Sequence, residues 1–230
     1  QNNNKYSLSH GLNASPRGSD AFVNIKNKDN IRVYSYNKSQ CDYYGATYGI
    51  DKSNFRIVGI PRHDKSWIKT IQDKSAKLPH NFDNNNSIII LSRHVNNVHC
   101  SLYEKIESVK NIKKLFIDKL GMKLIIKQHP NEKIERIFAS KADKIYEDIL
   151  GKHNYGSTWI YSDLHVFALG KEKNLAISLN TGVIFDMIAM DTPCIEYIDS
   201  SIELKNSKTY KRELTQFVKH GFIEGVVSYK

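Results

Sequence analysis

The stretch from Asn174 to Tyr197, NLAISLNTGVIFDMIAMDTPCIEY, constrains the fold more than any other part of the chain. Its apolar run Leu175–Ser178 predicts a buried strand, and the polar residues that follow predict a turn. A helix is expected over Val183–Met190, and Pro193 separates it from a second buried strand over Cys194–Tyr197. A unit of strand, turn, helix and strand is typical of a parallel sheet covered by helices.

The turn of this unit, Asn180-Thr181-Gly182, is a candidate anion site. Backbone N–H groups at a helix start, together with the helix dipole, favour a negative group such as a diphosphate. We expect Asn180 or Thr181 to cap the helix and to add side-chain donors, with Asp186 about one turn further in. The alternative is a purely structural turn, because many such units in α/β proteins bind nothing.

Strand-type runs alternate with helical stretches along the rest of the chain. Further strands are expected at Ala21–Ile25, Arg32–Tyr36, Phe55–Ile60, Ser87–Ser92, Lys123–Lys127 and Trp159–Tyr161. Further helices are expected at Lys38–Tyr44, Trp67–Gln72, Cys100–Leu120, Ala142–Leu150, Leu164–Leu169 and Tyr210–His220. This alternation predicts an α/β fold with a Rossmann-like parallel sheet, whose ligands lie beyond the carboxyl ends of the strands.

Composition excludes several classes of protein. The chain of 230 residues suits one large or two small domains, and it contains no apolar run near the roughly 20 residues that cross a bilayer. No signal peptide is visible, and the three cysteines lack metal-site spacing, which favours reduced cytosolic thiols. The formal charge of +10 suits phosphorylated substrates or an anionic membrane surface. Nucleic-acid recognition is not expected, because no zinc finger, RNP motif or basic helix appears.

Two further polar segments end predicted strands. Lys127-Gln128-His129-Pro130-Asn131-Glu132 follows the strand MKLIIK, and Pro130 stiffens the backbone of a histidine that can contact phosphate or act as an acid or base. Lys127 adds positive charge. Ser92-Arg93-His94 follows the strand SIIIL, and Arg93 can hold a phosphate with two hydrogen bonds. The plain alternatives are a loop histidine beside a turn proline and an arginine in a surface ion pair.

Weaker motifs lie earlier in the chain. Gly59-Ile60-Pro61-Arg62-His63-Asp64 is expected to shape a tight strand exit, with Asp64 capping the following helix. His10-Gly11 closes the run YSLSHG and leaves an exposed ring. No Walker loop, GxGxxG or GxSxG motif is present. No metal is expected, because the remaining histidines lack ligand spacing: His80, His99, His153, His165 and His220.

The order of these motifs resembles the CDP-glycerol glycerophosphotransferase family of teichoic-acid synthesis. It also resembles related capsule transferases that use cytidine-activated sugars. The series is HG near residue 10, GxPRxD near 60, KxHPN near 128 and SxNTGxxxDxxxxxxPxI from 178, and the likeness covers about residues 8–198. The resemblance implies a GT-B architecture, in which two Rossmann-like domains flank the active site. Residues 59–230 would then be its C-terminal nucleotide-binding half, and residues 1–58 a remnant of the N-terminal acceptor-side domain.

The resemblance also implies roles for individual residues. His10 would be the catalytic base on the acceptor side, and His129 would contact the donor diphosphate or assist the leaving group. Asp186 would reach the ribose or the sugar. Ser178, Asn180, Thr181 and Gly182 would line the donor phosphates. Apart from the resemblance, their positions after predicted strands make Arg93, His94 and Lys127 further candidates for binding the donor nucleotide or its phosphates.

The implied activity is a cell-envelope glycosyltransferase or glycerophosphotransferase. It would move a group from a CMP- or CDP-linked donor to a capsule polysaccharide or lipid-linked acceptor, with no cofactor and no metal. The implied location is the cytoplasm, and a lipid-linked acceptor would bring the protein to the inner face of the plasma membrane.

Other functions stay open. One is a non-hydrolysing nucleotide-sugar 2-epimerase, which favours Gly-Gly and a Glu pair where this chain has Asn180-Thr181-Gly182 and Asp186. Another is a half-enzyme that binds without catalysis. A nucleic-acid binder is the remotest, and it predicts steeply salt-dependent binding to any duplex.

Overall fold

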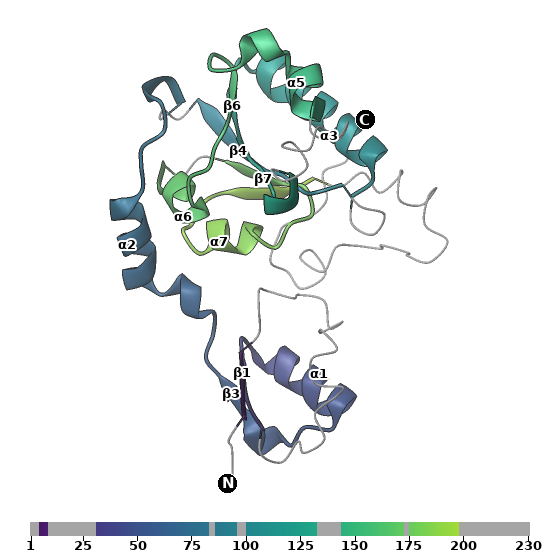
Figure 1. Ribbon diagram of the computed structural model, residues 1–230, viewed down its shortest axis with the longest axis vertical. Helices are drawn as coiled ribbons and strands as arrows, with labels where there is room; N and C mark the ends of the chain where they lie inside the picture. The colour runs from purple at the N-terminus through teal and green to yellow at the C-terminus, as the bar shows by residue number, and fades with distance from the viewer. Residues whose placement is uncertain are drawn as a thin grey trace. The chain divides into compact units, whose positions relative to one another are not determined.

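The computed structural model describes the backbone of Lys5–Leu8 and residues 31–82, 86–95, 100–132, 144–172 and 175–197. The chain forms two compact units, Gln1–Ile68 and Lys69–Lys230 (Figure 1). Their division falls within helix α2 (Lys65–Lys74), whereas the sequence placed a domain boundary near Gly59. The expected strand Ala21–Ile25 and helix Tyr210–His220 lie outside the described residues, as does His10.

The first unit contains a three-stranded parallel sheet of order β1-β2-β3. Its strands are β1 (Lys5–Leu8), β2 (Ile31–Ser35) and β3 (Phe55–Ile57), and α1 (Lys38–Tyr48) connects β2 to β3. The buried side of this sheet packs on one face of α1, which is why the residues of β2 alternate between buried and more exposed positions. The core residues are Ile31, Val33, Tyr44, Tyr48, Ile50 and Phe55.

The second unit is built on a five-stranded parallel sheet of order β6-β5-β4-β7-β8. Its strands are β4 (Ser87–Leu91), β5 (Lys123–Lys127), β6 (Trp159–Tyr161), β7 (Ala176–Ser178) and β8 (Cys194–Glu196). The chain runs outward from β4 to β6 and then returns to β7 on the other side of β4. The strand order therefore reverses between β4 and β7, the position where open α/β sheets bind ligands.

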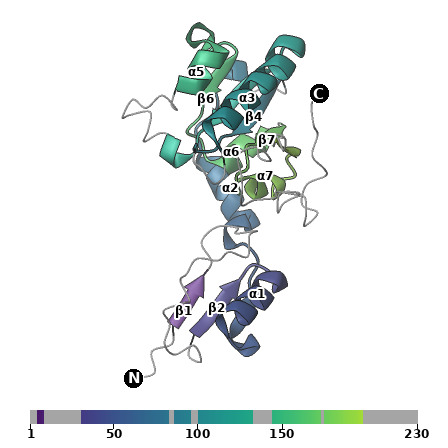
Figure 2. The ribbon, with the colours of Figure 1, turned by 90° about the vertical axis from the view of Figure 1, so that its right-hand side faces the viewer.

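Helices cover both faces of this sheet. Helices α3 (Leu102–Ile112) and α5 (Ile145–Leu150) pack together on one face (Figure 1). Helices α6 (Val166–Leu169) and α7 (Ile184–Ile188) pack together on the other, and the turned view of Figure 2 keeps both pairs adjacent. Every residue of β4 is buried, as expected for a central strand covered on both sides.

Short 3-10 turns lie at Lys52–Asn54, Pro61–His63, His80–Phe82, Lys152–Asn154 and Gly170–Glu172.

The predicted Rossmann-like parallel sheet is confirmed, with several bounds corrected. The strand expected over Phe55–Ile60 ends at Ile57, because Gly59 takes a positive φ of 68° and a 3-10 turn begins at Pro61. The helix expected over Cys100–Leu120 is α-helical only to Ile112 and continues as a π-helix over Lys113–Lys119.

Capping was predicted correctly at α2. The side chain of Asp64 accepts hydrogen bonds from the backbone N–H groups of Ser66, at 2.9 Å, and Trp67, at 3.2 Å. At α3 a full capping box forms between Ser101 and Glu104, which fixes where this long helix begins.

Candidate functional site

A cavity of about 290 Å³ opens at the carboxyl ends of the central strands of the second unit. Its wall is formed by residues that end β4 and β5, by the turn after β7, and by the starts of α6 and α7. This is the edge at which the strand order reverses, so the cavity lies where the topology favours a ligand. Its polar lining residues are Ser92, Lys127, Gln128, His129, His165, Thr181 and Asp186.

The structure brings several of the predicted site residues to this cavity. Lys127 and His129 reach it from the end of β5, Thr181 from the turn after β7, and Asp186 from α7. They come from two separate stretches of sequence, and they meet because β5 and β7 lie on either side of β4 and end at the same sheet edge. Asp186 is 4% exposed, so this carboxylate faces the cavity rather than bulk solvent.

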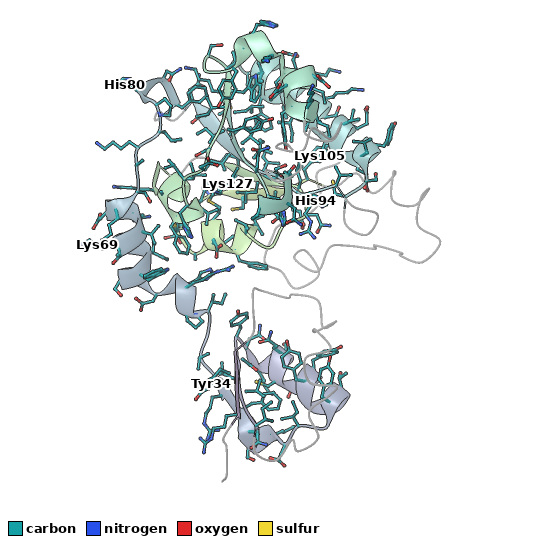
Figure 3. All side chains as sticks on the ribbon, in the orientation of Figure 1. Tyr34, Lys69, His80, His94, Lys105 and Lys127 are labelled. Atoms are coloured by element: carbon teal, nitrogen blue, oxygen red, sulfur yellow. The ribbon has the colours of Figure 1, made fainter. Side chains whose placement is uncertain are left out.

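Arg93 and His94 lie beside this group. The His94 ring centroid is 6.2 Å from that of His129, and the Arg93 carbonyl accepts a hydrogen bond from Lys105 Nζ at 3.0 Å. Figure 3 labels His94, Lys105 and Lys127 in the same region of the second unit. Three cationic or potentially cationic side chains therefore surround His129: Arg93 and His94 come from the segment after β4, and Lys105 comes from α3.

The turn after β7 is held by Ser178. Its hydroxyl accepts the Thr181 backbone N–H at 3.1 Å and is fully buried. Asn180 takes a φ of 55°, in the left-handed region that asparagine tolerates better than most residues. Ser178, Asn180 and Gly182 thus build the turn that carries Thr181, and they are not among the described residues that line the cavity. Their predicted contact with phosphate stays a prediction.

The predicted helix cap in this turn is wrong. Helix α7 begins after Val183 with no side-chain cap, so neither Asn180 nor Thr181 caps it. The reason is that the first N–H groups of the helix are already paired with backbone carbonyls: Ile184 N–H donates to the Thr181 carbonyl at 3.2 Å, and Phe185 N–H donates to the Gly182 carbonyl at 3.3 Å. Thr181 supports the start of the helix through its backbone carbonyl, and it also lines the cavity.

The backbone and ring of His129 are both fixed. Its backbone N–H donates to Glu132 Oε2 at 2.6 Å, and its Nδ1 accepts the Asn131 backbone N–H at 3.2 Å. A ring that accepts at Nδ1 is neutral and carries its proton on Nε2. Burial lowers the pKa of His129 from its ordinary value of 6.5, and the positive charges of Arg93, His94 and Lys105 lower it further. His129 is therefore a neutral hydrogen-bond donor at neutral pH.

A buried polar network lies beneath the His129 turn. Glu132 Oε1 forms an ion pair with Lys105 Nζ and accepts the Ser92 hydroxyl at 2.8 Å. Tyr146 from α5 donates its hydroxyl to Ser92 Oγ at 2.6 Å, and Lys105 Nζ lies 5.2 Å from the centre of the Tyr146 ring. Complete burial raises the pKa of Tyr146, so its hydroxyl stays protonated. The side chains of Lys105 and Glu132 are only 2% and 6% exposed.

The sequence analysis missed Lys105, Glu132 and Tyr146. A signal for Lys105 was present, because it stands four residues before Val109 and seven before Ile112 and so shares their buried helix face. A lysine in such a stripe needs a buried anion. Glu132 lay within the segment that carries His129, but nothing in that segment showed which cation it meets.

His165 was also missed, because it was considered only as a metal ligand. It lines the cavity, and its Nδ1 accepts the Phe167 backbone N–H at 3.2 Å, which caps α6. By the same argument as for His129, its neutral ring carries the proton on Nε2. The available signal was its position just after a buried strand, at the edge shared with Lys127 and His129.

Within the part of the chain that the structure describes, no three His, Cys, Asp or Glu side chains are grouped so that they could hold a metal ion. None of the helices in the described ranges has the length and apolar character required to span a bilayer.

The sequence matches no protein family and no curated protein. Its structure is similar to the crystal structure of a protein assigned as UDP-N-acetylglucosamine 2-epimerase from Listeria monocytogenes, with a TM-score of 0.53 and 16% identity. That alignment covers 76% of this chain and 44% of the other. A second likeness is to the wall teichoic acid polymerase TagF, with a TM-score of 0.47, 15% identity, and 80% and 42% of the two chains covered.

This chain thus spans less than half the length of these structures. The identities are low, so the likeness concerns the fold. The predicted fold class is confirmed: an α/β chain with a Rossmann-like parallel sheet of five strands, as in structures of the GT-B type.

Proposed function

We propose that the cavity binds the phosphates and the adjoining sugar of a nucleotide-activated donor, and that this chain is part of a GT-B transferase. The donor is a CMP- or CDP-linked compound, and the group transferred is a glycosyl or glycerophosphate unit. The acceptor is a surface polysaccharide or its lipid-linked precursor. The observation that carries this proposal is the convergence of Lys127, His129 and Thr181 on one cavity at the point where the strand order reverses.

Charge explains the choice of ligand. A leaving phosphate or diphosphate gains negative charge as its bond to the transferred group breaks, and fixed donors stabilise that charge without reorganising. The neutral His129 offers Nε2–H, Lys127 offers an ammonium group, and Thr181 offers a hydroxyl. Arg93 and His94 add positive potential beside the cavity. No metal ion is required in this scheme, because the cationic and dipolar groups perform the neutralisation.

Asp186 has a different role from its neighbours. A carboxylate repels phosphate. Asp186 lies in the cavity wall, so we expect its carboxylate to accept hydrogen bonds from hydroxyl groups of the donor. The ribose of the nucleotide and the transferred sugar both carry such hydroxyls. The base that removes the acceptor proton is His10 in this proposal, by resemblance to the transferase family, and His10 lies outside the described residues.

The resemblance in the motif series supports cytidine as the base and a capsule or teichoic-acid polymer as the product. The formal charge of +10 suits a lipid-linked acceptor in an anionic membrane. A 2-epimerase is the second candidate, because the Listeria protein that this chain resembles in fold is assigned that activity. The turn Asn180-Thr181-Gly182 and Asp186 distinguish this chain from the Gly-Gly and Glu pair that the epimerases favour.

A nucleotide panel read by thermal shift tests the proposal. CMP and CDP should raise the melting temperature, cytidine without phosphate should not, and His129→Ala should remove most of the rise. His80→Ala is the matched control, since His80 is exposed and Figure 3 shows it away from Lys127 and His94. No shift with any nucleotide at millimolar concentration would contradict the proposal. A larger shift with UDP, and a 2-epimer formed from UDP-N-acetylglucosamine, would favour the epimerase.

A further inference from the structure

Two charged side chains are buried directly beneath the turn that carries His129. Lys105 comes from the middle of α3 and Glu132 from the segment after β5, and both are almost fully shielded from solvent. A buried ion pair adds little net stability, because removing two charges from water offsets most of their attraction. Burial of this pair in the second unit therefore calls for an explanation other than stability.

The contacts of the pair join the two strand ends that form the cavity wall. Lys105 Nζ bonds to the carbonyl of Arg93, after β4, and to Glu132, after β5. Through its two oxygens, Glu132 then receives the Ser92 hydroxyl on one side and the His129 backbone N–H on the other. One carboxylate thus fixes a residue beyond β4 and a residue beyond β5 at the same time.

We infer that Lys105 and Glu132 are positioning residues, which hold the His129 turn and the exit of β4 in one arrangement before any ligand enters the cavity. That the held arrangement serves a phosphate ligand rests on the proposed function. Neither side chain lines the cavity, so neither contacts the ligand. Lys105 and Glu132 affect the ligand through the backbone of His129 and through Arg93 and Ser92.

Only a carboxylate at position 132 can accept all of these hydrogen bonds at once. Glu132 accepts three hydrogen bonds and donates none, and it uses both oxygens. Glutamine has the same shape but only one accepting atom, so Glu132→Gln must abandon either the His129 N–H or the Ser92 and Lys105 contacts. Methionine fills the volume of Lys105 but leaves the Glu132 charge buried without its cation.

Three variants separate positioning from stability: Glu132→Gln, Lys105→Met and the double variant Lys105→Met/Glu132→Gln. The double variant buries no unpaired charge, so its melting temperature should recover relative to Lys105→Met. The His129 amide should nevertheless exchange with solvent about tenfold faster than in the wild type, because the charged acceptor of its hydrogen bond is replaced by, at best, the neutral amide oxygen of the Glu132→Gln side chain. Its amide proton resonance should move upfield. CDP should bind about tenfold more weakly, as expected when a preorganised donor is released.

Three results would overturn either the positioning role of the pair or the proposed function. If the double variant recovers both its melting temperature and wild-type CDP binding, the pair is only structural and the inference is overturned. A wild-type exchange rate of the His129 amide in the double variant would overturn it as well. If the wild-type protein binds no nucleotide, the proposed function fails instead, while the exchange rate and amide resonance still test the role of the pair.

Discussion

The hydroxyl of Ser178 accepts the backbone N–H of Thr181 at 3.1 Å, so the last residue of β7 fixes the turn that brings Thr181 to the cavity. Both residues are buried, so the bond is shielded from bulk solvent. A serine at a strand end, which in sequence reads as one more polar ligand, acts here as the support of the turn.

Ser178→Ala should therefore destabilise the second unit. The change leaves the Thr181 N–H buried and unpaired, which costs about 1–3 kcal/mol of the free energy of unfolding. Urea unfolding of the variant measures the loss. Ser157→Ala is the control, since Ser157 is exposed and should change the free energy of unfolding little. Equal stability of the two variants would contradict the importance of the Ser178 bond.

His165 should contribute to ligand binding independently of its capping of α6. His165→Asn keeps an oxygen that can accept the Phe167 N–H, so stability should change little, while the Nε2 donor to the cavity is lost. His165→Ala removes both functions and should cost about 1 kcal/mol of stability. We expect both variants to reduce the thermal shift by CDP equally. Full CDP binding by His165→Asn would show that the ring serves only the helix.

The sequence predicted the fold for a physical reason. The runs Ser87–Leu91 and Lys123–Lys127 each hold at least three consecutive apolar residues, as expected for strands covered on both faces, and helical stretches separate them. Parallel strands end at one edge, so residues that follow different strands were expected to meet. Lys127, His129 and Thr181 do meet on one cavity.

The rest depends on tertiary packing that local sequence does not encode. Lys105 meets Glu132 because α3 lies across β4 and β5, and their separation of 27 residues gives no periodic signal. Thr181 was expected to cap α7 because its type favours that position. The N–H groups of Ile184 and Phe185 are instead paired with backbone carbonyls of the turn, which only the turn geometry reveals.

The pH dependence of stability should reveal the lowered pKa of His129. A base whose folded pKa lies below its unfolded pKa binds protons more readily when unfolded, so stability falls as pH drops below 6.5. His129→Gln does not titrate. The free energy of unfolding of the wild type, minus that of His129→Gln, should therefore decrease between pH 7 and pH 5 and be constant above pH 7. A difference that rises at low pH would mean that the protonated ring is stabilised, contrary to the neutral state inferred from its hydrogen bonds.

Asp186 offers a test of how the donor is oriented. Asp186→Asn keeps the shape of a side chain that is 4% exposed but removes the charge that favours hydroxyl donors, so affinity should fall about tenfold. If the carboxylate contacts the ribose, isothermal titration should show the same loss for CMP, CDP and a CDP-linked donor. A contact with the transferred group should weaken only the linked donor and leave CDP unchanged. Stronger binding of CDP by Asp186→Asn would show instead that the carboxylate faces phosphate and repels it, and the assignment of the sugar side of the cavity would then be wrong.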